Sequence, residues 1–102
     1  MKNTKVNVKI HWIPIRKNGK KTIPLNTEYY VITKPLKGKN GDISSWSLVL
    51  NVKNCLQETS TQRVSLGEAH FLMAEAPSFL FKRGFILDIY EGPKKVGTVE
   101  VM

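Results

Sequence analysis

The side chains that could perform acid–base, nucleophilic or metal chemistry are few, and they are His11, Cys55, His70, Asp88 and Glu91. A zinc site normally takes three or four ligands, and two histidines far apart in the chain do not supply them. Cys55 stands in a polar stretch whose one cationic neighbour is Lys53, so nothing predicts the lowered pKa of a nucleophilic thiol. We therefore expect no catalytic, cofactor or metal site and no enzyme activity. A deep pocket that joined a histidine to Asp88 or Glu91 would instead support an enzyme.

Nucleotide hydrolysis and a membrane partner are also not expected. The chain contains no G-x-x-x-x-G-K-[ST] run, the loop that holds the phosphates of a nucleoside triphosphate. No apolar run approaches the ~20 residues that cross a bilayer, and the first residues are polar, unlike those of a signal peptide. The single cysteine excludes an intramolecular disulfide. A reducing compartment, by default the cytoplasm, is the expected location.

The net charge of +8 belongs entirely to the first part of the chain. Residues 1–40 contain ten Lys/Arg and one acid, giving +9, whereas residues 41–102 contain six Lys/Arg and seven acids, giving −1. Such asymmetry is typical of proteins that bind a polyanion, although loop lysines also keep a small β domain soluble. Lysines outnumber arginines in this part, and arginine is the residue for bidentate contacts. Sequence-specific reading of a nucleic acid is therefore not expected.

Basic side chains in two loops, with aromatic side chains near them in the sequence, form the candidate binding surface. Its residues are Trp12, Arg16, Lys17, Lys20, Lys21, Tyr29, Tyr30, Lys37 and Lys39. Cationic and aromatic groups together are typical of small domains that bind RNA. If the two loops lie at one end of the domain, they form a cationic rim.

A protein partner is the alternative function. Exposed aromatic side chains can anchor an acidic partner, and an edge strand can mediate self-association. The sequence does not choose between RNA and protein, and it leaves the oligomeric state open.

The elements that must position these residues are mostly strands. A chain of 102 residues has the size of one domain, so residues 1–102 are expected to form a single domain. Alternation of apolar and polar residues, the period of a half-buried strand, predicts strands near 6–10, 29–33, 43–52, 85–90 and 95–102. Asn-Gly pairs at 18–19 and 40–41 predict hairpin turns, and the polar stretch 54–62 is predicted to be a loop. Short strands joined by Gly and Asn turns predict an all-β barrel or sandwich.

Residues 65–76 fit either a helix or a strand. Ser65 and Glu68 match a capping box, and the apolar residues from Ala69 to Ala76 recur at helical spacing. Pro77 would then end the helix. Read as a strand, the same segment places alternate apolar residues on one face, although its local propensity favours the helix.

The last part of the chain resembles the C-terminal β-barrel domain of elongation factor Tu. The resemblance is carried by the run Glu91-Gly92-Pro93-Lys94-Lys95-Val96-Gly97 between two apolar strands. Residues 18–25 look like the family's Gly-Gly-Arg-x-x-Pro hairpin, Tyr29-Tyr30 falls where the family has an aromatic strand, and Leu66-Gly67-Glu68 resembles its Pro-Gly-Glu turn. These segments follow the family order over most of the chain. The resemblance implies a small closed six-stranded antiparallel barrel without the GTPase domain.

The resemblance also implies a function and resolves the ambiguous segment. The family's barrel contacts tRNA and docks on other domains and exchange factors, so a non-catalytic binding module is expected. In the family the segment after the Pro-Gly-Glu turn is a strand, which makes Ala69–Glu75 a strand here. Gly92 and Gly97 suit a tight turn and a close backbone approach. Glu91 is expected to accept backbone N–H groups at that turn.

Overall fold

The computed structural model describes residues 5–17, 19–20, 22–38, 40–59 and 61–102. The described residues form eight strands and two short 3₁₀ turns. Their bounds are β1 (Val6–Trp12), η1 (Ile15–Lys17), β2 (Glu28–Thr33), β3 (Leu36–Lys37), β4 (Ile43–Ser44), β5 (Ser47–Glu58), β6 (Arg63–Phe71), η2 (Ser78–Leu80), β7 (Ile86–Glu91) and β8 (Lys94–Val101).

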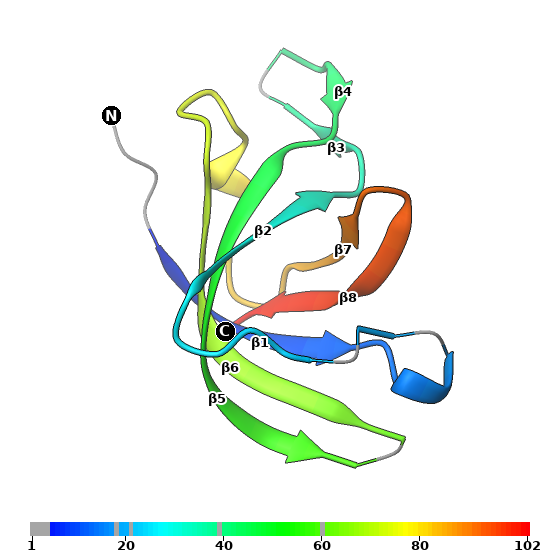
Figure 1. Ribbon diagram of the computed structural model, residues 1–102. Coiled ribbons are helices and arrows are strands. Elements are labelled where there is room, and N and C mark those ends of the chain that lie inside the picture. The colour runs from blue at the N-terminus through cyan, green and yellow to red at the C-terminus, as the bar shows by residue number, and fades with distance from the viewer. Residues whose placement is uncertain (1–4, 18, 21, 39, 60) are drawn as a thin grey trace.

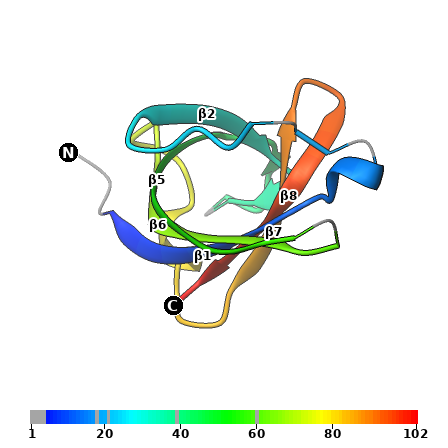
Figure 2. The same cartoon turned by 60° about the horizontal axis from the view of Figure 1, so that its bottom comes forward.

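Six of these strands form a closed antiparallel barrel in the order β1-β6-β5-β2-β7-β8, with β8 paired back to β1. Figure 1 shows the strands wrapping around one another, and Figure 2 shows them arranged in a ring. The remaining strands, β3 and β4, form a separate small hairpin. The prediction of an all-β, closed, six-stranded antiparallel barrel is confirmed.

The barrel core is built by strict alternation along the strands, because successive side chains of a strand point to opposite faces. In β6 every second residue from Arg63 to Phe71 is buried, and Val8 and Ile10 of β1 are fully buried. At the Phe71 end of β6, Phe71 stacks on Phe81 with ring centroids 4.5 Å apart. The opposite end of β6 begins with Arg63, which pairs with Trp12 of β1.

One of the two predicted hairpins is present. Asn40-Gly41 lies in the turn between β3 and β4, where Gly41 has a φ of +82° and the Gly38 N–H donates to the Asp42 carbonyl at 2.8 Å.

The hairpin predicted at Asn18-Gly19 is wrong, because β1 and β2 do not pair with each other. β1 pairs instead with β6 and β8, and β2 pairs with β5 and β7. Gly19 is needed for a different reason, since a Cβ built on it would lie 1.9 Å from the Ile13 carbonyl oxygen. Asn18 itself lies outside the described residues.

The loop predicted at 54–62 is largely strand. β5 continues to Glu58 and pairs with the first residues of β6, with register shifts between Val52 and Asn54 and between Cys55 and Gln57. The stretch is polar because this part of β5 is exposed on both faces. The single strand predicted at 43–52 is divided, since β4 ends at Ser44 and β5 begins at Ser47.

The strand predicted at Ala69–Glu75 is correct only as far as Phe71. β6 ends there because β5, its partner, begins at Ser47, and the Leu72 N–H makes a last bond to the Ser47 carbonyl at 3.0 Å. Residues 72–76 form bends and a turn instead. Neither the predicted strand nor the helical alternative extends through this part of the described chain.

Candidate nucleic-acid interface

The two basic loops of the candidate surface do not form one rim. Arg16 and Lys17 lie in η1, and Lys37 lies in β3; all three side chains are exposed. In Figure 1 the β3–β4 hairpin stands at the top of the barrel, whereas η1 projects at the lower right. Lys21 and Lys39 lie outside the described residues.

Two of the three predicted aromatic residues meet inside the protein, since the ring centroids of Trp12 and Tyr29 lie 6.0 Å apart, whereas Tyr30 lies on the exposed face of β2. Trp12 is 4% exposed, and its indole Nε1 donates to the Ser65 hydroxyl at 2.9 Å. Its ring therefore belongs to the core and offers no surface for a base. Tyr30 is exposed on the outer face of β2, and its hydroxyl donates to the Glu28 carboxylate at 3.3 Å. The charge of Glu28 raises the pKa of Tyr30.

Lys20 and Tyr29 are engaged with Glu91. Lys20 Nζ lies 2.8 Å from Glu91 Oε2 and 5.0 Å from the Tyr29 ring centroid, and the Tyr29 hydroxyl donates to the same carboxylate oxygen. The hydrogen bond from Lys20, followed by that from Tyr29, lowers the pKa of Glu91. Burial, together with Glu91, raises the pKa of Tyr29. These side chains are therefore occupied within the protein.

The cluster of Lys20, Tyr29 and Glu91 joins β2 and β7, whose backbone pairing is short. β2 and β7 pair only at Ile32 with Tyr90 and at Thr33 with Ile89. Beyond that point Glu91 joins β7 to Tyr29 of β2 and to Lys20 of the preceding connection. The sequence predicts that Glu91 accepts backbone N–H groups at the turn. Its carboxylate instead accepts bonds from two side chains that are distant in sequence.

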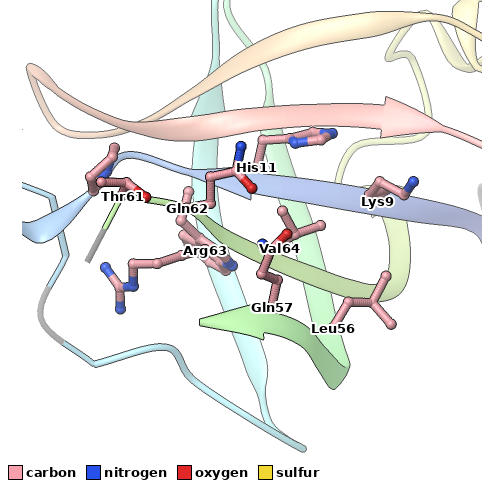
Figure 3. Close-up of a pocket in the computed structure, with 10 residues that line it drawn as sticks. Lys9, His11, Leu56, Gln57, Thr61, Gln62, Arg63 and Val64 are labelled. Carbon is pink, nitrogen blue, oxygen red and sulfur yellow. The ribbon is translucent and has the colours of Figure 1, made fainter. Parts of the chain in front are cut away.

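A groove on the outer face of the barrel brings together residues that the sequence did not group. It has a volume of about 450 Å³ and lies between β1 and the β5–β6 hairpin (Figure 3). Its lining residues are Lys9, His11, Trp12, Pro14, Leu56, Gln57, Thr61, Gln62, Arg63 and Val64. Because Val8, Ile10 and Trp12 point into the core, the alternate residues of β1 face outwards and border this groove.

The second register shift of β5 shapes one wall of the groove. Cys55 pairs with Ser65 and Gln57 pairs with Val64, so Leu56 is the extra residue between two paired positions. A bulge of this kind redirects side chains and is common beside functional sites. Leu56 is left 54% exposed next to Gln57, and Figure 3 shows the two along the same edge.

Arg63 lines the groove, but its guanidinium is engaged within the protein. The side chain is 2% exposed, its guanidinium donates to the Lys20 carbonyl, and its Nε lies 3.5 Å from Glu58 Oε1. Figure 3 shows the guanidinium turned away from Gln57 and Leu56. A buried cation must be paired, and here it links the β5–β6 hairpin to the connection between β1 and β2. Only the alternation of residues 63–71 could have signalled its buried position.

A smaller hollow continues the groove towards η1. It has a volume of about 260 Å³, is lined by Pro14, Arg16, Lys17 and Thr61, and shares Pro14 and Thr61 with the groove. Among the described residues that line the two hollows, none is acidic. Two acids contact lining residues from outside the hollows: Glu100 Oε1 lies 3.6 Å from His11 Nε2, and Glu58 Oε1 lies 3.5 Å from Arg63 Nε.

No group of three or more His, Cys, Asp and Glu side chains that could hold a metal ion occurs among the described residues. Among the same residues no helix is long and apolar enough to cross a membrane. The fold and the groove define a small antiparallel β-barrel with a cationic, amide-rich hollow on its outer face. No protein family, curated protein or solved structure matches the chain.

Proposed function

We propose that the protein is a non-catalytic module that binds RNA along the groove and the hollow beside it. The observation that carries this proposal is the continuous surface from Lys9 past His11 to Arg16 and Lys17, with no acid among its described lining residues. Cations that replace the counterions of phosphates supply most of the affinity of non-specific nucleic-acid binding. The resemblance to the elongation-factor barrel supports the same proposal.

Two features favour RNA over self-association through a strand edge. The barrel is closed, so its strands have partners on both sides over much of their length. Beyond the bridge between Leu25 and Val52, the outer edge of β5 has no paired strand among the described residues. That edge carries two register shifts and ends in Glu58, features that discourage pairing with another chain.

A low-salt titration with a fluorescein-labelled RNA oligonucleotide tests the proposal. The variant Arg16→Glu/Lys17→Glu is expected to lose affinity by about tenfold or more, since two phosphate contacts become repulsive. Lys82→Glu/Arg83→Glu is the matched control, because it reverses the charge of another exposed Lys/Arg pair. This control is expected to bind nearly as the native protein does.

Three results would overturn the proposal. Native protein that does not bind below ~10 µM at low salt excludes it, since even non-specific binders reach 10⁻⁴–10⁻⁶ M at physiological salt. An equal loss in both double variants would show that net charge alone attracts RNA. Poly-L-glutamate that binds the groove as tightly as RNA would favour an acidic protein partner.

A further inference from the structure

We infer that the groove takes an unpaired nucleotide, so that the ligand class is single-stranded rather than duplex RNA. This inference rests on the proposed function and concerns the same site. Two features of the groove support it. One is the apolar lining by Leu56 and Val64, and the other is the pair of side-chain amides on the β5–β6 hairpin. Apolar side chains can pack on the face of a base, and amides can bind its edge. In a duplex the face is stacked and the Watson–Crick edge is paired.

The apolar lining of the groove on the β5–β6 hairpin consists of Leu56 and Val64. They lie at neighbouring positions of the β5–β6 hairpin, because Gln57, the residue after Leu56, pairs with Val64. Leu56 is 54% exposed although nothing in the core requires an apolar side chain there. The face of a base is apolar and is buried favourably against such a surface. Trp12, which the sequence placed on the binding surface, is buried, so Leu56 and Val64 are the apolar groups that a base can contact here.

The amides are those of Gln57 and Gln62. Each has a carbonyl acceptor and an NH₂ donor, both side chains are exposed, and Figure 3 shows them on the hairpin wall beside Val64. An unpaired base presents free donors and acceptors on its Watson–Crick edge. In a duplex the Watson–Crick edges are already paired, so they are not available to these amides.

The basic side chains indicate where the phosphates of a bound strand lie. Lys9 stands at one end of the groove and Thr61 at the other, with His11 between them (Figure 3). The hollow with Arg16 and Lys17 begins at Thr61. A volume of about 450 Å³ lies in the range of pockets that enclose a small ligand, which suits one nucleotide. A strand that enters at Lys9 and follows the groove thus brings later phosphates beside Arg16 and Lys17.

Fluorescence anisotropy with one labelled RNA strand, alone and annealed to its complement, tests the inference. The single strand is expected to bind about tenfold more tightly than the duplex. Gln57→Ala, Gln62→Ala and Leu56→Ser are each expected to weaken single-strand binding several-fold, with duplex binding unchanged. Asn54→Ala is the control for the amides, since it lies on β5 outside the groove, and Leu72→Ser controls for an exposed leucine.

The outcomes separate the inference from the function on which it rests. If single strand and duplex bind equally and both respond to Arg16→Glu/Lys17→Glu, the inference is wrong and the proposed function stands. The same conclusion follows if Leu56→Ser behaves as Leu72→Ser does. If neither form of RNA binds, the proposed function fails as well. A selective loss of single-strand binding in the groove variants supports the inference.

Discussion

At the scale of single residues, close contacts inside the barrel account for several residue types. A Cβ on Gly67 would lie 2.3 Å from the Asn51 carbonyl oxygen, and one on Gly97 would lie 2.7 Å from the His11 carbonyl oxygen. Both glycines therefore permit neighbouring strands to approach, which confirms the expectation for Gly97. Gly92 has a φ of +57°, as the tight turn between β7 and β8 requires.

The buried bond between Trp12 and Ser65 gives a prediction at this scale. Ser65→Ala removes the acceptor of the indole N–H, and both residues are almost completely buried. An unpaired buried donor costs about 1–3 kcal/mol, and the free energy of unfolding in urea is expected to fall by that amount. Ser44→Ala, at an exposed position of β4, is the matched control. A Ser65→Ala protein as stable as that control would contradict the prediction.

At the scale of elements, side-chain contacts join strands where their backbone pairing is short or ends. β2 and β7 share only two paired positions, and the Lys20–Tyr29–Glu91 cluster joins them where that pairing ends. Arg63 plays a comparable part at the end of β6, where it binds the carbonyl of Lys20. The connection between β1 and β2 is therefore held at Lys20 by Glu91 of β7 and by Arg63 of β6.

Glu91 predicts a dependence of stability on pH. Its pKa is lowered in the folded protein below the usual 4.5, so it stabilises the fold above that pH and ceases to do so as the pH falls through the folded value. Glu91→Gln is expected to be less stable at pH 7, and its difference from the native protein should shrink below pH 4.5. The effect is modest because the carboxylate is 37% exposed.

Thermal unfolding between pH 2 and 7 measures this difference. Glu75→Gln, which alters an exposed carboxylate outside the cluster, serves as the control and should follow the native pH profile. A constant difference between Glu91→Gln and the native protein across the whole range would show that the bond contributes nothing through ionisation.

At the scale of the whole molecule, the excess charge is distributed over more than one region. Among the described residues, the basic side chains of residues 1–40 are those of Lys5, Lys9 in β1, Arg16 and Lys17 in η1, Lys20, Lys34 and Lys37 in β3, and Lys20 is paired with Glu91. The molecule thus attracts anions broadly, but Lys9, Arg16 and Lys17 are the cations at its groove.

This distribution predicts the salt dependence of RNA binding. Three phosphate contacts to a single strand give a slope of log K against log salt near −2, since each contributes about −0.7. Arg16→Glu/Lys17→Glu should reduce the slope by more than half. Lys37→Glu, on the distant β3–β4 hairpin, should leave it nearly unchanged. Titrations between 50 and 200 mM salt measure it, and an equal change in both variants would show that the groove does not direct binding.

The sequence by itself determined the all-β class and the faces of most strands. Alternation identifies the inward residues of β1 and β6 because the period of a strand is a local property of the backbone. The sequence also shows that the first part of the chain is basic, and η1, which belongs to that part, lines the hollow beside the groove. The resemblance of the C-terminal segment added the closed six-stranded barrel, which the structure confirms.

Only the tertiary structure decided which strands are neighbours and which side chains meet. Asn18-Gly19 looked like a hairpin turn, yet β1 and β2 are separated in the barrel by other strands. The groove depends on a hairpin that appeared to be a loop, and on β1 lying beside it. Pairing between strands far apart in the chain is set by the packing of the whole core, so no local pattern contains it. For the same reason Trp12 is a core residue, and Lys9 and Gln57 border one groove.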